Sequence, residues 1–258
     1  MVGRYESPRP AEDAMELSFW AATDVGRKRE HNEDNVLVDK KLSLFVVADG
    51  MGGHASGEVA SHIAVHELRN TIEARQDLLD GFAKQNGEAG EVRSQDILAL
   101  LEQGVQSAGG AIFQRGKVEQ EKRGMGTTIS ALLLVGGRGF VAHVGDSRIY
   151  LLRQDQVIQL TEDHSLINEL IRRGKVTKDG LSRSPYSAYK NAVTRAVGVY
   201  ETVQVDTIDF DVLPGDRFLI CSDGLHSYLD DDKLKALFAG EEITTIPKAF
   251  IDHANEAG

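Results

Sequence analysis

The sequence has little of what secreted, membrane-spanning and nucleic-acid-binding proteins depend on. Its 258 residues include a single cysteine, Cys221, so no internal disulfide can form and a reducing compartment is expected. No run approaches the roughly 20 apolar residues that a membrane span requires, and the N-terminus has no apolar signal-peptide segment. Acidic residues outnumber basic ones: the formal net charge is −11, whereas a nucleic-acid binder needs a basic surface. We therefore expect a cytoplasmic protein without membrane or nucleic-acid partners.

The composition is that of a globular protein. With 41% hydrophobic and 27% charged residues, the chain can bury a core as one large domain or two small ones. No internal repeat or interdomain linker interrupts it. Residues 1–14 are polar, include Pro8 and Pro10, and are predicted to form a flexible leader, so the folded domain is expected to cover residues 15–258.

Hydrophobic periodicity predicts both helices and strands. Alternating or continuous short apolar runs predict strands, and apolar residues repeating every three to four positions predict helices. Strands are expected over residues 17–25, 35–39, 43–48, 127–135, 139–144, 149–152, 157–160, 203–210 and 217–221. Helices are expected over residues 57–74, 95–120, 165–174, 234–238 and 246–257, with loops at 80–93 and 175–190. This order lacks the regular strand–helix alternation of a doubly wound fold and predicts an α+β protein with sheets between helix pairs.

Three apolar strands end in an aspartate flanked by glycine or serine, namely Asp49, Asp146 and Asp223. One such sequence alone is often an ordinary turn. A carboxylate beside permissive glycine backbone also suits a hard cation, because the carbonyl of a residue such as Gly50 can turn inward as a second ligand. Asp34 lies just before another strand and is a fourth candidate.

Carboxylates gathered at one site stay ionised only when cations neutralise them. Oxygen ligands without histidine or cysteine favour Mg²⁺ or Mn²⁺ over zinc. Two such ions about 4 Å apart can deprotonate a bridging water that attacks a phosphoryl group in line. Arg29 offers a planar fork suited to a phosphate, although an exposed basic turn over residues 27–29 is the alternative.

Seven short motifs occur in order along the chain. They are Arg29…Asn32-Glu33-Asp34, Val47-Ala48-Asp49-Gly50-Met51-Gly52-Gly53-His54, Gly126-Thr127-Thr128, Gly145-Asp146-Ser147-Arg148, Asp163-His164-Ser165, Thr194-Arg195-Ala196-Val197-Gly198 and Ser222-Asp223-Gly224-Leu225. Together they resemble the metal-dependent serine/threonine protein phosphatases of type 2C, particularly their compact bacterial branch. The resemblance extends from about residue 17 to the C-terminus.

The resemblance implies a central antiparallel β-sandwich flanked by pairs of α-helices, with two Mn²⁺ or Mg²⁺ ions at one end. Asp49 would bridge both ions, and the Gly50 carbonyl would bind one of them. Asp223 would hold the other, and Asp34 would bind a metal or position a metal-bound water. Asp146 would complete a third, weaker metal site with Asp223.

The implied reaction is hydrolysis of phosphoserine and phosphothreonine by a metal-bound hydroxide, without a covalent phosphoenzyme. Arg29 would bind the substrate phosphate, and residues 168–192 would form a flap beside the site. The partners would be phosphorylated proteins and a serine/threonine kinase, and the enzyme is expected to be a monomer. His54 would either protonate the leaving alkoxide or cap the following helix.

Other polar residues of the motifs are predicted to be structural. His164 is most simply part of a helix N-terminal cap with Asp163 and Ser165. Thr127 and Thr128 are expected to begin a buried strand rather than to contact the site. Cys221 lies on an apolar strand and is expected to be a buried small hydrophobe, not a nucleophile.

The C-terminus departs from the family pattern. In the family, a Gly-x-Asp-Asn segment and a final strand follow the last helix, and that Asp is another metal ligand. This sequence ends at Gly258, so the resemblance implies a domain without that strand. The alternative function is therefore a pseudophosphatase or regulatory phosphoprotein-binding module with an incomplete metal site.

Overall fold

The computed structural model describes residues 16–52, 56–85, 90–177, 180–181, 184–189, 191–239 and 242–258. The predicted leader over residues 1–14 and the candidate His54 lie outside these ranges. None of the helices within them is both long and apolar enough to cross a membrane.

The larger of two antiparallel sheets has the strand order β1–β2–β4–β5–β8, with β3 paired to β2. Its strands are β1 (Asp34–Asp39), β2 (Leu44–Met51), β3 (Gly126–Thr127), β4 (Ile129–Val135), β5 (Arg138–Val144) and β8 (Asp206–Asp211). Every residue of β4 is buried, because this central strand is covered on both faces. Its sequence, apolar except for Ser130, reflects that position.

The smaller sheet has the order β7–β6–β9. Its strands are β6 (Arg148–Arg153), β7 (Gln156–Gln159) and β9 (Arg217–Cys221). The two sheets pack face to face around a buried apolar cluster that includes Leu132 and Val141 of the larger sheet and Ile149 of the smaller one. The predicted antiparallel sandwich is therefore confirmed.

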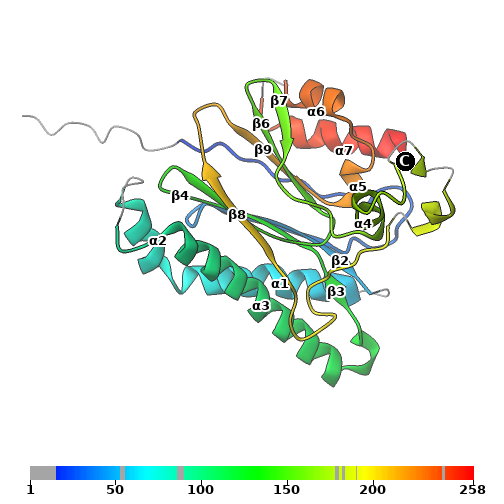
Figure 1. Cartoon of the computed structure of the whole chain (residues 1–258), viewed down its shortest axis with the longest axis horizontal. Coiled ribbons are helices and arrows are strands. Elements are labelled where there is room, and N and C mark those ends of the chain that lie inside the picture. The colour runs from blue at the N-terminus through cyan, green and yellow to red at the C-terminus, as the bar shows by residue number, and fades with distance from the viewer. Residues whose placement is uncertain are drawn as a thin grey trace, which may run out of the picture.

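Helices cover both outer faces of the sandwich (Figure 1). On the larger sheet lie α1 (Ser56–Glu73), α2 (Gln76–Ala83) and α3 (Ser94–Val118). On the smaller sheet lie α6 (Asp231–Phe238) and α7 (Ile246–Ala257). Each outer layer has its own apolar core, so the α+β prediction of sheets between helix pairs is confirmed.

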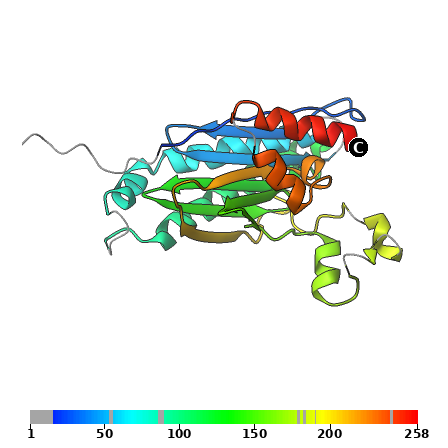
Figure 2. The same ribbon diagram turned by 90° about the horizontal axis from the view of Figure 1, so that it is seen from above.

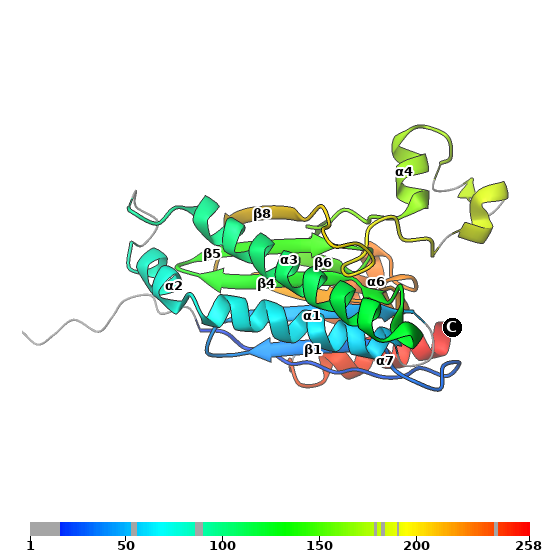
Figure 3. The same cartoon turned by 90° about the horizontal axis from the view of Figure 1, so that it is seen from below.

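Short helical segments lie near one end of the sandwich. They are η1 (Gln120–Lys122), α4 (Leu166–Arg172), η3 (Pro185–Tyr189) and α5 (Asp223–His226). Of these, α4 and η3 project away from the sheets (Figures 2 and 3). The irregular surface excursion expected after residue 174 is consistent with this arrangement.

Two predicted elements are wrong. Residues 17–25 form no strand, because no backbone hydrogen bond joins them to another described residue and an apolar pattern alone does not make a strand without a partner. The loop predicted from residue 80 begins too early, since α2 continues to Ala83. There Phe82 is buried against Phe140, with ring centroids 5.3 Å apart, and this contact favours the last turn of the helix.

Candidate metal centre

The hairpin formed by β1 and β2 brings the first two carboxylates together. Asp34 is the register partner of Asp49 in this antiparallel pair, and directly opposed residues project their side chains from the same face of the sheet. Both residues lie at the end of the sandwich where β2 passes into the glycine-rich segment. The strand-end position noted in the sequence is thus also a position of close carboxylate approach.

Close backbone packing explains the glycine after Asp49. The Gly50 N–H donates to the Glu33 carbonyl at 3.1 Å, and a Cβ at Gly50 would lie 2.1 Å from the carbonyl oxygen of Gly57. Since real Cβ atoms do not approach oxygen so closely, only glycine fits between β1 and the start of α1. Gly50 is consequently packed directly against the backbone of Glu33 and Gly57.

Two buried threonines hold the backbone of Asp49. The Thr128 hydroxyl accepts from the Asp49 N–H at 2.9 Å, and the Thr127 hydroxyl donates to the Asp49 carbonyl at 2.9 Å. Both threonines are buried, as predicted. The expectation that they do not contact the site is wrong, because these bonds fix the strand end from which the Asp49 side chain projects.

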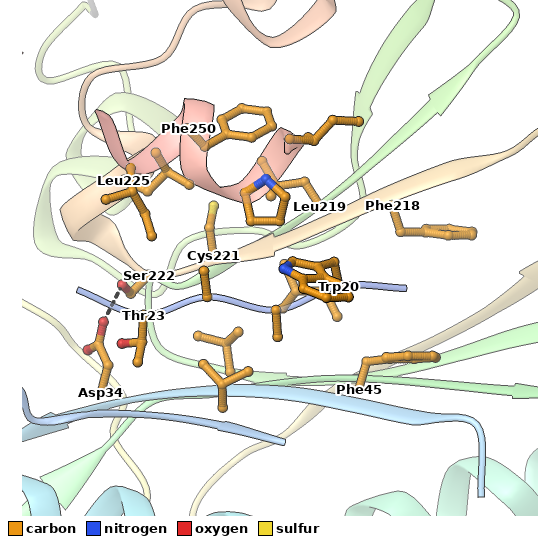
Figure 4. Close-up of a pocket in the computed structure, with 18 of the residues that line it drawn as sticks. Trp20, Thr23, Asp34, Phe45, Phe218, Leu219, Cys221, Ser222, Leu225 and Phe250 are labelled. Atoms are coloured by element: carbon orange, nitrogen blue, oxygen red, sulfur yellow. Dashed lines mark hydrogen bonds between the residues drawn. The ribbon is translucent and has the colours of Figure 1, made fainter. Parts of the chain in front are cut away.

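The third carboxylate, Asp223, begins helix α5, and one residue separates it from the end of β9. The preceding residue, Ser222, donates its hydroxyl proton to Asp34 Oδ2 at 2.7 Å (Figure 4). This bond joins the smaller sheet to the larger one at the acidic end of the sandwich. The Ser222 contact was not anticipated from the sequence, although its position next to Asp223 is a signal that could have indicated it.

The four candidate aspartates form one electrostatic cluster. Burial, together with the negative charges of Asp34, Asp223 and Asp146, raises the pKa of Asp49 to about 9. Burial also raises the pKa of Asp34, against the hydrogen bond from Ser222 that lowers it. Burial and the charge of Asp223 raise the pKa of Asp146 to about 6. The protein's own groups therefore leave this cluster short of positive charge.

A fifth acidic residue, Glu33, has a carboxylate oxygen that the described residues leave without a partner. Its Oε1 atom is buried and has no hydrogen-bond partner among the described residues, which is costly for a carboxylate oxygen. It lies against Gly57, where an added Cβ would come within 2.5 Å of it. A cation or its bound water would satisfy this oxygen, so the observation fits a cation site. The sequence placed Glu33 in a motif but assigned it no role.

The donor set is made only of oxygen atoms, which suits Mg²⁺ or Mn²⁺. Within the described ranges, no three His, Cys, Asp or Glu side chains converge closely enough to hold one ion by themselves. A bound ion would therefore take its remaining ligands from backbone carbonyls and water, as these two metals commonly do.

A pocket of about 1440 Å³ opens beside the cluster. Arg29, Asp34, Asp49 and Asp223 line its acidic end, and the positive charge of Arg29 opposes the upward pKa shifts of Asp34 and Asp49. Away from the carboxylates the wall becomes apolar: Trp20, Phe45, Phe218 and Phe250 line it (Figure 4). The predicted phosphate-binding arginine thus shares a pocket with three of the four aspartates.

Of the remaining sequence candidates, Cys221 and Ser165 have the predicted structural roles and His164 does not. Burial raises the pKa of the Cys221 thiol to about 12, so Cys221 is the buried small hydrophobe predicted and not a nucleophile. Ser165 caps α4 by accepting from the Asn168 N–H at 3.2 Å, as expected. His164 takes no part in that cap, and instead its Nδ1 accepts from the Gly145 N–H at 3.1 Å.

An oxygen-only carboxylate cluster at the end of an antiparallel sandwich, facing a pocket with an arginine, is typical of hydrolases that use hard divalent cations. The chain belongs to the protein phosphatase 2C family, whose model matches residues 25–246. It is 37% identical over 241 residues to the serine/threonine phosphatase stp of Listeria innocua, covering 92% of this chain and 89% of that one.

Solved structures agree with this membership. The fold is similar to the Mycobacterium tuberculosis serine/threonine phosphatase PstP/Ppp (TM-score 0.76, 31% identity, 90% of this chain and 89% of that chain). It is also similar to the catalytic domain of PstP in complex with two manganese ions (TM-score 0.73, 32% identity, 90% and 89%). The protein is therefore a metal-dependent serine/threonine protein phosphatase.

Proposed function

We propose that this phosphatase hydrolyses phosphoserine and phosphothreonine with two divalent ions, Mn²⁺ or Mg²⁺, held by the aspartate cluster. The observation that carries the proposal is the gathering of four aspartates at one end of the sandwich, where Asp34 opposes Asp49 in the β1–β2 pair and where burial, together with the neighbouring carboxylates, raises the pKa values of Asp34, Asp49 and Asp146. Such a cluster gains most from a bound cation, because a cation removes the repulsion and lets every carboxylate ionise. When bound, the two divalent ions would supply a nucleophile from water and neutralise charge on the phosphoryl group.

Each residue of the cluster has a distinct proposed role. Asp49 interacts electrostatically with the other three aspartates and would be the ligand shared by both ions, with the Gly50 carbonyl beside it. Asp223 would be the second ligand. Asp34, oriented by the Ser222 hydroxyl at 2.7 Å, would bind a metal or position a water molecule beside it. Asp146 supports a third, weaker ion with Asp223.

Substrate binding is proposed for the pocket and its border. Arg29 lines the acidic end of the pocket and binds the phosphate through its guanidinium fork. Residues 168–192, which include the projecting η3, are proposed as a flap beside the site. The substrates are phosphorylated proteins, and a serine/threonine kinase that makes them is the expected partner. A monomer in the cytoplasm remains the prediction from sequence.

Two Asp→Asn substitutions, one on β2 and one at the start of α5, test the proposal together with a matched control on β1. Mn²⁺-dependent hydrolysis of p-nitrophenyl phosphate and of a phosphothreonine peptide is measured for the wild type, Asp49→Asn, Asp223→Asn and Asp39→Asn. Asp39 lies at the opposite end of β1 from Asp34 and pairs with Arg69 at 2.7 Å, roughly 17 Å away along the strand. The first two variants should lose turnover while remaining folded, and Asp39→Asn should keep it.

Two results would contradict the proposal. If both Asp49→Asn and Asp223→Asn retained metal-dependent turnover, neither residue would be an essential metal ligand. A wild type that binds phosphopeptide but never hydrolyses it, at any Mn²⁺ or Mg²⁺ concentration, would instead support the phosphoprotein-binding alternative.

A further inference from the structure

The turn that carries Asp146 is held by two buried histidines. Its first residue, Gly145, donates its N–H to His164 Nδ1 at 3.1 Å and accepts from the His164 N–H at 2.7 Å. On the other side, His226 Nε2 lies 2.8 Å from the carbonyl oxygen of Asp146. The two histidines are only 5% and 7% exposed, so water does not compete strongly for these contacts.

The two contacts require opposite hydrogen-bonding roles. A backbone N–H can only donate, so His164 Nδ1 must be the acceptor and its proton must reside on Nε2. A carbonyl can only accept, so His226 Nε2 must carry a proton. Burial lowers the pKa of both histidines, which favours the neutral ring that each assignment uses. One histidine therefore accepts through Nδ1 and the other donates through Nε2.

A carboxylate sets the His164 tautomer. His164 Nε2 lies 3.0 Å from Asp206 Oδ2 and 3.1 Å from Arg195 Nη1, and the other oxygen of Asp206 accepts from the same Nη1 at the shorter distance of 2.8 Å. Because the Gly145 N–H makes Nδ1 the acceptor, the Nε2 proton is directed to Asp206 Oδ2, and Arg195 gives its hydrogen bond to Asp206 Oδ1. That leaves Nδ1 to accept from Gly145, in the way that a hydrogen-bonded carboxylate orients many metal-binding and catalytic histidines.

Each histidine also links the turn to a different part of the site. The His164 carbonyl accepts from the Thr194 N–H at 2.7 Å, and the next residue, Ser165, bridges to Val193. Both ends of the projecting excursion over residues 166–192 thus meet at His164. His226 is the last residue of α5, the helix that Asp223 begins.

We propose that His164 and His226 are positioning residues that hold the Gly145–Asp146 turn from opposite sides and present the Asp146 carboxylate to the cation cluster. The inference rests on the proposed function, because it takes Asp146 as a ligand of the third, weaker ion. Through His164 the base of the excursion and the Asp146 ligand become mechanically connected. Through His226 the Asp146 and Asp223 ligands keep a fixed separation.

An exchange of asparagine and glutamine tests this idea. The side-chain amide of asparagine reaches about as far as imidazole Nδ1, and that of glutamine about as far as Nε2. His164→Asn should keep the bond to Gly145 and His164→Gln should lose it. The order reverses at the other histidine, where His226→Gln should keep the bond to Asp146 and His226→Asn should lose it.

Calorimetric Mn²⁺ titration of the four variants measures the consequence. Loss of such an orienting contact weakens a metal site by 10-fold to 100-fold in general, so we expect at least a roughly 10-fold higher Kd for the weakest ion in His164→Gln and His226→Asn. Hydrogen exchange of the Gly145 amide in the metal-free protein gives a second readout. It should accelerate in His164→Gln and stay slow in His164→Asn. Turnover should fall through kcat rather than KM.

Asp206→Asn provides an independent variant at a partly exposed residue, which the fold should tolerate. Arg195 would hold the amide oxygen, so the amide N–H₂ would face His164 Nε2 and favour the wrong tautomer. This variant should match His164→Gln in Mn²⁺ affinity and in Gly145 exchange.

The outcomes separate the inference from the function on which it rests. If the same residue, whether asparagine or glutamine, preserved Mn²⁺ affinity better at both histidines, side-chain size alone would explain the result. That outcome would overturn the positioning idea. Wild-type Mn²⁺ affinity in Asp146→Asn would also overturn it while leaving a two-ion phosphatase intact. A wild type with neither Mn²⁺ uptake nor turnover would overturn the proposed function as well.

Discussion

Mn²⁺ binding should release protons from this enzyme near neutral pH. Burial and the neighbouring carboxylates raise the pKa of Asp49 to about 9, so Asp49 carries a proton at pH 7 in the metal-free protein. A cation binds the carboxylate and not the acid, and one proton must therefore leave as the ion binds. The apparent affinity should then improve about tenfold for each unit of pH between 6 and 8, which corresponds to about 1.4 kcal/mol per unit.

Titration calorimetry in buffers of different ionisation enthalpy counts these protons directly. The observed enthalpy plotted against buffer enthalpy should have a slope of about one proton at pH 7. Because the pKa of Asp146 is raised to about 6, proton release should increase further below that pH. Asp146→Asn is the matched control: it should keep the release at pH 7 and lose the additional part.

A slope of zero at pH 7 would refute the reasoning. It would mean that the metal-free cluster is already ionised, and that burial does not raise the pKa of Asp49. A pH-independent affinity between pH 6 and 8 would lead to the same conclusion.

Three further predictions concern the substrate, the packing and the stability. Arg29→Ala should raise KM for a phosphopeptide more than it lowers kcat, provided that the guanidinium binds ground state and transition state alike; a pure kcat effect in steady-state kinetics would contradict this. Gly57→Ala should lower the free energy of unfolding by about 1–3 kcal/mol, because its Cβ would lie 2.5 Å from Glu33 Oε1. The control Gly110→Ala, with no atom within 4 Å of its Cβ on helix α3, should be neutral or stabilising by up to about 1 kcal/mol in the same denaturant titration. The metal-free protein should lose thermal stability as pH rises from 6 to 9, because the folded state holds the Asp49 proton more tightly than the unfolded chain, and a melting temperature that rises instead would contradict the assignment.

The candidate site illustrates how far local sequence reasoning extends. Asp34, Asp49, Asp146 and Asp223 were selected because a carboxylate ends or begins an apolar strand, which is a local property. The β1–β2 hairpin, whose register opposes Asp34 to Asp49, is also nearly local. Ser222 reaches Asp34 across 188 positions, and no periodicity in either segment predicts that contact.

The two wrong secondary-structure predictions also arise because local sequence does not show long-range contacts. The apolar alternation over residues 17–25 predicts a strand, but a strand forms only when a neighbouring backbone pairs with it. The polar sequence around residue 80 predicts a loop, but burial of Phe82 against Phe140 extends α2. In both segments a long-range contact, or the lack of one among the described residues, outweighs local preference.

The amino-acid sequence by itself determined the class of fold, the acidic residues and, through the ordered motifs, the family. These follow from hydrophobic periodicity and residue chemistry, which are written locally along the chain. Tertiary structure alone decided which groups orient those acids and how far burial shifts the Asp49 pKa. It also decided that His164 and His226 contact the Gly145–Asp146 turn through opposite hydrogen-bonding roles. Desolvation and hydrogen-bond direction depend on neighbours distant in sequence, so they exist only once the two sheets have packed.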